Sequence, residues 1–389
     1  GVFNGNLGSF WGRAVSEFNT SMGLTELMCN MLFAPVREEI NSRREELSIY
    51  DQTCGMGNLI FTAADNITRI VSGCKPCHLS LYGQDINSKV LGKTQSVAFL
   101  SGYNMNNFRS GDALYDDKFE HKQFDYILSN FPIGLRWHRS AIKSNNLKYR
   151  IGLPKSQDAT MLFIQDIISK MKNSSRACFI TTGNALVGGG FGSGENSVRK
   201  YLIDHDMIDC IVALPPVMQE TSIPVYLWIL TKEKESFRVG TTQFINARNI
   251  FKKEHRQFLL SKDHIDEIVN IYKHYQNNVL SKIVKNADLG ELQLTIEQPI
   301  RNDITFDIDD YDAIKLDKQG HRIADPSKEF TEVVSLNVDA DEYFEKKIIP
   351  NIDEESWIDY SKTLIGYRFN FNKIFVAFGH RISSLKLKV

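Results

Sequence analysis

The feature that most constrains this chain is an alternation of strand-like and helical segments from residue 23 to residue 231. Apolar residues recur at helical spacing over residues 23–33, 59–70 and 89–100. The strand-like runs lie at residues 47–51, 80–82, just before 111, 124–128, 177–181, 208–214 and 225–231. Such alternation predicts an α/β fold with a mostly parallel sheet covered on both faces, in which ligands bind beyond the carboxyl ends of the strands.

Beyond about residue 235 the alternation weakens. A helix is predicted over residues 262–275, and residues 303–329 are rich in charge and turn residues. At 389 residues the chain exceeds one usual core of roughly 100–200 residues. We therefore predict a helical lead-in over residues 1–45, a main domain over residues 46–235 and a C-terminal extension over residues 236–389. Because the chain begins at Gly1 without a methionine, we expect its N-terminus to be incomplete.

Charge and hydropathy indicate which classes of protein this chain can belong to. No run of about 18 apolar residues is present, and the first residues lack the basic and apolar regions of a signal peptide. We therefore expect a cytoplasmic protein without a membrane partner. The net charge of -1 argues against a chain that grips nucleic acid tightly on its own. A nucleic-acid enzyme of this charge needs a local basic patch or a partner.

Six scattered cysteines are too few for a disulfide scaffold, so reduced thiols are expected. Cys74, Cys77 and His78 spell a haem-attachment pattern, but that pathway needs an exported protein. A tetrahedral zinc site would need a second close pair of ligands. We interpret Cys74 and Cys77 as loop residues and expect no metal.

Residues 51–57, Asp-Gln-Thr-Cys-Gly-Met-Gly, lie where the first strand turns into a helix. Glycines at such a turn let backbone amides approach a ligand closely. The dinucleotide pattern G-x-G-x-x-G is absent, because Gly57 is followed by Asn58, Leu59 and Ile60. The candidate binding residues here are Asp51, Thr53, Cys54, Gly55 and Gly57, and the alternative is a turn that needs glycine for packing only.

Two further acidic residues follow strands. Asp85 ends the second strand, where a carboxylate can accept hydrogen bonds from the two hydroxyls of a ribose. Asp112 follows the third strand and could meet the amino group of an adenine ring, although an acid at this place more often forms a turn. Both are candidate ligand-binding residues.

The most informative segment is a buried strand, residues 124–129, that ends in Asn130-Phe131-Pro132-Ile133. This segment resembles the (Asn/Asp/Ser)-Pro-Pro-(Tyr/Phe/Trp) motif of methyltransferases that act on exocyclic or amide nitrogens. Together with the glycine turn and Asp85 at ordinary spacing, it makes the chain similar to the N6-adenine DNA methyltransferases, and in particular to the modification subunits of type I restriction-modification systems.

The chemistry explains the motif. An adenine amine shares its lone pair with the ring, so acceptors must hold its two hydrogens while the nitrogen attacks a methyl sulfonium. The resemblance implies that these acceptors are the Asn130 side chain and the Phe131 carbonyl, with Pro132 favouring an extended residue 131. It places Ile133 where the family has an aromatic ring that stacks on the extruded base. Phe131 and Trp137 are the alternative rings that could stack on the base instead.

The likeness covers roughly residues 15–375. It includes residues 153–163, 188–195, 197–202, 211–215, 331–333, 357–359 and 366–369. It implies a Rossmann-like S-adenosylmethionine-dependent methyltransferase fold, residues 46–235 as the catalytic domain, partner contacts in residues 236–389 and a missing N-terminal helical domain. S-adenosylmethionine is the implied cofactor, and Thr20 is a further implied contact to it. Double-stranded DNA and a specificity subunit are the implied partners. Whether a restriction subunit is another partner stays open, as do the target sequence and the stoichiometry.

Two other segments invite functional interpretations. The glycine-rich residues 188–194 lie between a strand and a helix but lack the Gly-Lys-Ser/Thr ending of a phosphate loop, so we expect a flexible connection. Basic residues follow the motif and either track DNA phosphates or form a solvated face. These residues are Arg136, His138, Arg139, Lys143, Lys148 and Arg150, with Trp137 among them.

The sequence leaves three functions in competition. The first is methyl transfer from S-adenosylmethionine to the N6 of adenine in duplex DNA, with the base flipped beside Asn130. The second is a catalytically degenerate scaffold that binds cofactor and partners, which Phe131 and Ile133 suggest. The third is methylation of a protein glutamine amide, which uses a similar motif. The segments around Trp357 and Tyr367 favour DNA modification over the third function.

Overall fold

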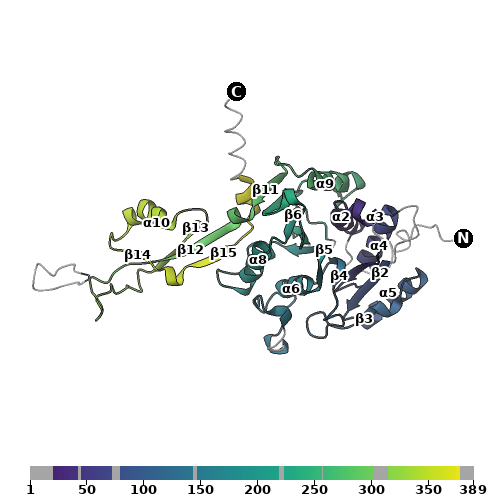
Figure 1. Ribbon diagram of the computed structural model, residues 1–389, viewed down its shortest axis with the longest axis horizontal. Coiled ribbons are helices and arrows are strands. Elements are labelled where there is room, and N and C mark those ends of the chain that lie inside the picture. The colour runs from purple at the N-terminus through teal and green to yellow at the C-terminus, as the bar shows by residue number, and fades with distance from the viewer. Residues whose placement is uncertain are drawn as a thin grey trace, which may run out of the picture.

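A large sheet with helices on both faces forms the centre of the molecule, and a smaller sheet extends from one side of it (Figure 1). The computed structural model describes residues 21–42, 45–71, 79–142, 147–218, 223–255, 257–301 and 314–376. The strand order in the large sheet is β11-β8-β6-β7-β5-β4-β1-β2-β3. Its strands are β1 (Leu47–Asp51), β2 (Leu79–Asp85), β3 (Phe108–Ser110), β4 (Phe124–Ser129), β5 (Met171–Thr182), β6 (Ile208–Leu214), β7 (Val225–Thr231), β8 (Thr241–Asn246) and β11 (Ser281–Lys285).

The sheet is mostly parallel, as the alternation of elements predicts. Strand β1 pairs in parallel with β2 and β4, β2 with β3, β4 with β5, and β6 with β8. Strand β7 is antiparallel to both of its neighbours, β5 and β6, and β11 is antiparallel to β8. The carboxyl ends of β4, β1, β2 and β3 therefore lie side by side along one edge of the sheet.

Four of the nine helices in the described ranges lie where the sequence predicts them, at residues 23–33, 59–70, 89–100 and 262–275. The nine helices are α2 (Met22–Phe33), α3 (Arg37–Ser42), α4 (Asn58–Ile70), α5 (Ser88–Leu100), α6 (Thr160–Lys170), α7 (Asn184–Val187), α8 (Gly194–Asp204), α9 (Lys262–His274) and α10 (Ala340–Tyr343). Short 3-10 turns lie at Met105–Asn107, Arg139–Ala141, Leu147–Tyr149, Ser236–Arg238, Asn286–Leu289, Ile349–Asn351 and Tyr360–Lys362. No helix in these described ranges is both long and apolar enough to cross a membrane.

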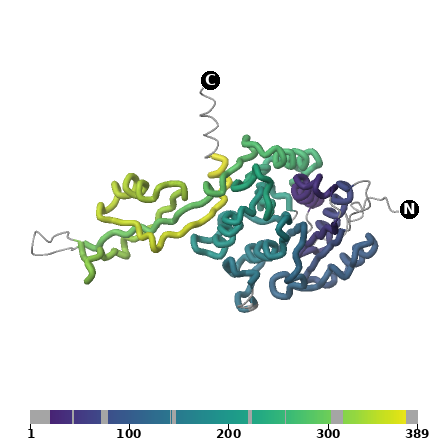
Figure 2. Tube along the Cα trace, viewed as in Figure 1, coloured from purple at the N-terminus to yellow at the C-terminus, as the bar shows by residue number. Residues whose placement is uncertain are grey.

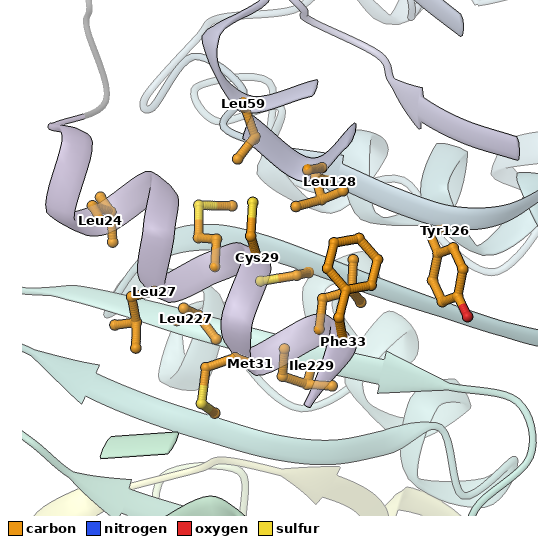
Figure 3. Close-up of a cluster of buried hydrophobic side chains, with 14 of the residues drawn as sticks. Leu24, Leu27, Cys29, Met31, Phe33, Leu59, Tyr126, Leu128, Leu227 and Ile229 are labelled. Atoms are coloured by element: carbon orange, nitrogen blue, oxygen red, sulfur yellow. The ribbon is translucent and has the colours of Figure 1, made fainter. Parts of the chain in front are cut away.

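Helix α2 is buried between the sheet and its neighbours α4 and α9 (Figure 3). It begins after Ser21, whose hydroxyl accepts a hydrogen bond from the Leu24 amide at 3.4 Å. The helix carries buried residues on most of its circumference, which is typical of a helix inside a core. At its end the Phe33 ring meets Tyr126 of β4 edge to face, with the ring centroids 5.1 Å apart. Residues 22–33 are therefore an integral part of the main core.

The opposite face of the sheet is covered by α6, α8 and a segment from near the end of the chain. Phe369, Phe371 and Ile374 are buried there with Trp228 and Phe244. Since β8 and β11 also belong to the large sheet, the main domain extends past residue 235 and includes residues from two stretches of the chain, before and after the smaller sheet. These long-range contacts have no local sequence signal.

The smaller sheet, which we call the arm, leaves the main domain after β11 and returns to it through β15 (Figure 2). Its strands are β12 (Gly290–Glu297), β13 (Phe330–Ser335), β14 (Trp357–Ile358) and β15 (Leu364–Tyr367). Helix α10 and the π-helical residues Phe344–Ile348 cover one face of the arm. A separate two-stranded ribbon consists of β9 (Lys252–Glu254) and β10 (Gln257–Leu259).

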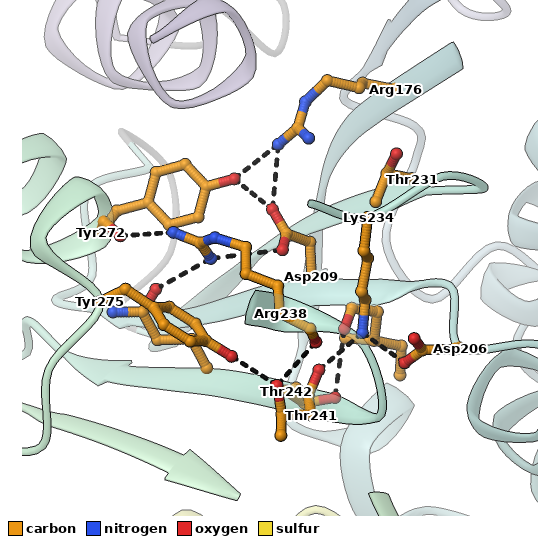
Figure 4. Close-up of polar contacts among 12 residues, drawn as sticks. Arg176, Asp206, Asp209, Thr231, Lys234, Arg238, Thr241, Thr242, Tyr272 and Tyr275 are labelled. Carbon is orange, nitrogen blue, oxygen red and sulfur yellow. Dashed lines mark hydrogen bonds and ion pairs between the residues drawn. The ribbon is translucent and has the colours of Figure 1, made fainter. Parts of the chain in front are cut away.

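A buried polar network fastens α9 to the start of β6 (Figure 4). The Asp209 carboxylate forms ion pairs with Nη2 of Arg176 at 3.0 Å and with Nη1 of Arg238 at 3.3 Å. The Tyr272 hydroxyl of α9 also donates to Asp209. Because two guanidinium groups neutralise the one carboxylate, this network is a closed structural site. We call these four residues the Asp209 network.

Candidate active site

A cavity of about 750 Å³ lies beyond the carboxyl ends of β4, β1, β2 and β3. Most of the site residues predicted from the sequence line it, although they are far apart in the chain. These are Asp51, Thr53, Cys54, Gly55, Asp85, Asp112, Asn130, Phe131, Pro132 and Ile133. Gly57 belongs to the same turn as Gly55 without lining the cavity, and Thr20 lies outside the described residues.

The turn after β1 needs its two glycines for different reasons. Gly55 and Gly57 have φ angles of 49° and 82°, in the left-handed region that other residues rarely adopt. A Cβ on Gly57 would also overlap the Phe61 ring, so this glycine is required for packing as well. The turn is held to β2 by a hydrogen bond from the Cys54 amide to the Gln84 carbonyl at 2.9 Å. Backbone atoms therefore form one wall of the cavity.

Asp51, at the end of β1, is only 2% exposed, and its Oδ1 accepts a hydrogen bond from the Thr53 amide at 3.0 Å. Burial raises the pKa of Asp51 to about 7, and the negative charge of Asp85 adds to this rise. The Thr53 amide and the Ser129 hydroxyl lower the pKa of Asp51 but do not offset burial. Asp51 is thus a buried carboxyl group whose ionised form is disfavoured by its surroundings.

Asp85 organises the neighbouring turn. Its Oδ2 accepts from the Gly55 amide at 2.9 Å, and its Oδ1 accepts from the Asn87 amide at 2.8 Å. Asp112 forms a turn, because its Oδ1 accepts from the Leu114 amide at 2.8 Å, and it also lines the cavity. A carboxylate offers about four acceptor positions, so both residues keep capacity for a ligand.

The Asn-Phe-Pro-Ile segment begins where β4 ends at Ser129. Phe131 is buried, and its ring stacks on Phe163 with centroids 4.9 Å apart and planes 7° apart. Asn130 and Ile133 are half-buried at the cavity wall. The Thr53 and Ser129 hydroxyls lie 3.3 Å apart, which joins the turn after β1 to the strand that carries the motif.

The cavity has further lining residues that the sequence did not single out. They are Gln52, Met56, Asn58, Leu59, Ile86, Asn87, Val90, Lys93, Ala113, Tyr115, Leu135, Phe163, Thr182, Met218, Ile223 and Val225. Ile86 and Asn87 directly follow Asp85, so their position in the chain was an available signal. Thr182 ends β5, and its place at a strand end was a weaker one. Phe163 and Tyr115 carry no local pattern that marks them.

The basic segment after the motif divides into exposed and buried parts. Arg136 is exposed and lines the cavity, and His138, Arg139 and Arg150 are also exposed. Trp137 is buried, and its Nε1 donates to the Lys155 carbonyl at 3.0 Å, so it presents no ring to a ligand. Lys143 lies outside the described residues.

Lys148 does not belong to the exposed basic face. Its Nζ lies 2.8 Å from Asp166 and 3.1 Å from Asp117, and all three side chains are nearly inaccessible to solvent. Lys170 pairs with the same two carboxylates. Burial lowers the pKa of Lys148, but Asp166 and Asp117 outweigh burial and keep it above its ordinary value. Lys148 is therefore a buried ion-pair residue, and neither alternative for the basic segment, phosphate contact or a solvated face, holds for it.

The glycine-rich residues 188–194 form a packed turn rather than the flexible connection we expected. Arg199 of α8 donates through Nη2 to the Gly188 carbonyl at 2.7 Å and through Nε to the Tyr367 carbonyl. Asn196 accepts from the Tyr367 amide at 2.8 Å. A Cβ on Gly188, Gly189 or Gly194 would overlap Asn184, Ser193 or Leu153 respectively, so neighbouring residues and Leu153 require glycine there. The turn is absent from the cavity lining.

The four cysteines within the described ranges, Cys29, Cys54, Cys178 and Cys210, are free and buried. Cys74, Cys77 and His78 lie outside those ranges. In the described part of the chain, no group of three His, Cys, Asp or Glu side chains is arranged to hold a metal ion.

Comparison with known proteins identifies the relatives of this chain. The family model described as N-6 DNA Methylase matches residues 6–314. The type I restriction enzyme MjaIX methylase subunit of Methanocaldococcus jannaschii is 27% identical over 359 residues, which cover 90% of this chain and 61% of that protein. The chain therefore spans less than two thirds of the length of this relative.

Solved structures share the fold. The type I restriction-modification methyltransferase subunit from Streptococcus thermophilus aligns with a TM-score of 0.62 and 23% identity, covering 72% of this chain and 58% of that one. A modification subunit of a putative type I restriction enzyme from Vibrio vulnificus aligns with a TM-score of 0.54 and 18% identity, covering 79% of this chain and 58% of that one. The expected Rossmann-like methyltransferase fold, with its C-terminal appendage, is confirmed.

Proposed function

We propose, from the premise that this chain belongs to the N-6 DNA methylase family, that it transfers a methyl group from S-adenosylmethionine to the N6 of adenine in DNA, as the modification subunit of a type I restriction-modification complex. The observation that carries this proposal is the convergence of the Asn130–Ile133 segment and of Asp51, Asp85 and Asp112 on one cavity. The whole activity belongs to a larger assembly than this chain.

The residues of the cavity fit S-adenosylmethionine. The volume of about 750 Å³ suits a ligand of this size. The cofactor carries a positive sulfonium and a positive ammonium group, and the buried carboxyl of Asp51 gains from a nearby positive charge. We assign Asp51 and the backbone of residues 53–57 to the amino-acid part, Asp85 to the ribose hydroxyls and Asp112 to the adenine amino group.

The chain must make a poor nucleophile reactive. S-adenosylmethionine supplies a methyl group bound to a positively charged sulfur. Asn130 Oδ1 and the Phe131 carbonyl accept the two hydrogens of the target amine, which favours a more tetrahedral nitrogen with an available lone pair. The stacking of Phe131 on Phe163 holds the backbone carbonyl of residue 131 in a fixed position. Orientation is therefore achieved before the methyl group moves.

Partners are needed for the choice of target. The net charge of the chain is -1, and Arg136, His138, Arg139 and Arg150 are the exposed basic side chains that follow the motif. We propose that these four contact phosphates beside the flipped base, while a separate specificity subunit reads the sequence. The isolated chain should accordingly bind DNA weakly and without sequence preference.

The test uses the full chain co-purified with its specificity subunit, DNA and radiolabelled S-adenosylmethionine. Asn130→Ala should lower methyl transfer by about 10²- to 10³-fold, because one of the two acceptors is removed. The same variant should bind S-adenosylmethionine as the parent does in calorimetric titration. Asp85→Ala should show the opposite pattern, with weaker cofactor binding, because Asp85 does not touch the amine.

The matched control is Asn106→Ala, which truncates an exposed asparagine outside the cavity. It should change neither cofactor binding nor transfer. Unreduced transfer in Asn130→Ala would remove Asn130 from the mechanism. A parent complex that binds cofactor and DNA without any transfer would instead favour a scaffold. Label in a glutamine residue of a protein would favour amide methylation.

A further inference from the structure

The cavity wall has an aliphatic side chain at Ile133, so an aromatic face for the extruded base must come from elsewhere if it exists. Phe131 cannot turn toward the cavity, because it is 1% exposed and stacked on Phe163. Trp137 is 2% exposed, and its indole N–H is bonded to the Lys155 carbonyl at 3.0 Å. Turning either ring outward would break buried packing or a buried hydrogen bond.

Tyr115 differs from both rings. It lies in the loop after β3 and lines the same cavity as Asn130 and Ile133. Its side chain is 39% exposed, whereas Phe131 and Phe163, the other aromatic rings among the described lining residues, are at most 3% exposed. Its ring is thus the accessible aromatic surface of the described cavity wall.

Two hydrogen bonds position Tyr115, one through its backbone and one through its phenol group. Its backbone amide donates to the Asp112 carbonyl at 3.2 Å, which fixes the turn after β3. Its phenol oxygen accepts a hydrogen bond from the His138 amide at 2.9 Å. His138 belongs to the segment that continues directly from the Asn130–Ile133 motif, so the ring is tied to the side of the cavity that carries the motif. A ring fixed before binding loses little conformational entropy when a base stacks on it.

We propose that Tyr115 is the positioning residue that stacks on the flipped adenine, and that Ile133 gives the base apolar contact in place of a second ring. This inference rests on the proposed methyl transfer to adenine. Asn130 would hold the amine while Tyr115 holds the plane of the base. Base stacking on an aromatic ring is sequence-tolerant, which suits a subunit that leaves sequence recognition to a partner.

The experiment measures base retention without measuring transfer. The adenines methylated by the parent complex are located first by sequencing of the methylated DNA. The complex with its specificity subunit is then titrated with two duplexes, one with a mispaired adenine at that position and one with an abasic site there. Mispairing lowers the energy needed for extrusion, so the affinity ratio of the two duplexes reports on contacts to the flipped base.

The parent should prefer the adenine duplex over the abasic duplex. Tyr115→Leu should reduce this preference by about 5- to 150-fold, which is the range expected for the loss of one stacking contact. Its affinity for the abasic duplex and for S-adenosylmethionine should stay within about twofold. Tyr115→Phe should keep most of the preference, because it retains the ring. Phe99→Leu, at an exposed ring outside the cavity, is the matched control and should change nothing.

Each contrary outcome has a separate meaning. An unchanged preference in Tyr115→Leu would overturn the stacking role while leaving the proposed function intact. Loss of S-adenosylmethionine affinity with an unchanged preference would assign Tyr115 to the cofactor, which also overturns the inference. An equal loss in Tyr115→Leu and Tyr115→Phe would show that the hydrogen bond to His138 matters and the ring does not. A parent complex that methylates no adenine in the first step would refute the proposed function itself.

Discussion

Asp209 and Asp51 are both buried, but they lie at opposite ends of the strands of the large sheet and have different surroundings. Asp209, near the start of β6, is paired with Arg176 and Arg238 (Figure 4). Burial alone would raise the pKa of Asp209, but the two arginines outweigh burial and lower it. Asp51, at the end of β1, is equally buried, yet burial and the charge of Asp85 raise its pKa to about 7.

This difference separates the Asp209 network, which stabilises the fold, from the surroundings of Asp51, which we propose bind a ligand. The Asp209 network contains its own positive charges, so it is complete within the chain. The groups that shift the pKa of Asp51 are a backbone amide, a hydroxyl and another acid, and none of them is positively charged. Functional sites often carry such locally unfavourable arrangements, which the rest of the fold supports.

The largest effect is expected at the Asp209 network, at the start of β6. Asp209→Asn leaves two buried arginines without their shared carboxylate, which should lower the free energy of unfolding by about 3–5 kcal/mol. The control is Asp204→Asn, which removes an ion pair to Lys200 whose two side chains are each 41% exposed, and it should cost less than about 1 kcal/mol. Urea unfolding of both variants at pH 7 measures the two values. Similar losses in the two variants would show that the Asp209 network is not a stabilising site.

The opposite sign is expected for Asp51→Asn. Because the folded pKa of Asp51, about 7, lies above the ordinary aspartate pKa of 3.8, the folded state holds a proton more firmly, and stability falls as pH rises between these values. The asparagine variant lacks this loss, so at pH 8 it should be more stable than the parent by up to about 4 kcal/mol. The advantage should disappear near pH 4. Urea unfolding without cofactor at both pH values measures this difference, and a pH-independent difference would contradict the explanation.

Cofactor affinity should share this pH dependence with reversed sign. If S-adenosylmethionine binds to the ionised form of Asp51, its dissociation constant should rise as pH falls below about 7, by up to about tenfold per pH unit. Binding near pH 7 should also release protons, which calorimetry in buffers of different ionisation enthalpy detects. Asp51→Asn should bind more weakly and with a flatter profile. An equally steep profile in that variant would place the titrating group elsewhere.

The smallest effect is expected from filling the cavity. Ile133→Phe adds a ring beside the flipped base and should raise the methylation rate of the assembled complex by about 5-fold or less, the lower end of a stacking contact, if Tyr115 already stacks. By contrast, Val212→Phe enlarges a fully buried residue inside β6 and should destabilise the fold by about 1–3 kcal/mol. A rate increase near 100-fold would show that the parent has no stacking ring.

The sequence predicted the parts of this molecule that depend on local order. The strand ends that carry Asp51, Asp85, Asp112 and Asn130 were recognisable, because a parallel sheet aligns its carboxyl ends whatever the connecting helices contain. The accessible ring of Tyr115 was not recognisable, because its exposure depends on a hydrogen bond to His138, 23 residues away.

Long-range pairing explains the other differences. Lys148 has the same local surroundings in the sequence as an exposed basic residue, but Asp117 and Asp166 bury it. Strands β8 and β11 join the large sheet although alternation has weakened, since only their neighbours in space complete the pattern. The cofactor and catalytic roles assigned to the cavity residues stay predictions until the variants above are measured.

The pairing of Gly290 with Tyr367 has a consequence for the topology of the chain. The polypeptide leaves the main domain and re-enters it at adjacent points, so the arm is an excursion with a closed neck. Lengthening or shortening the chain at the far end of this excursion alters the span of the arm without changing the separation of its two ends. A force applied to the arm by a bound partner would be transmitted through β12 and β15 together. The neck is fastened to α8, because Asn196 accepts from the Tyr367 amide at 2.8 Å and Arg199 donates to the Tyr367 carbonyl.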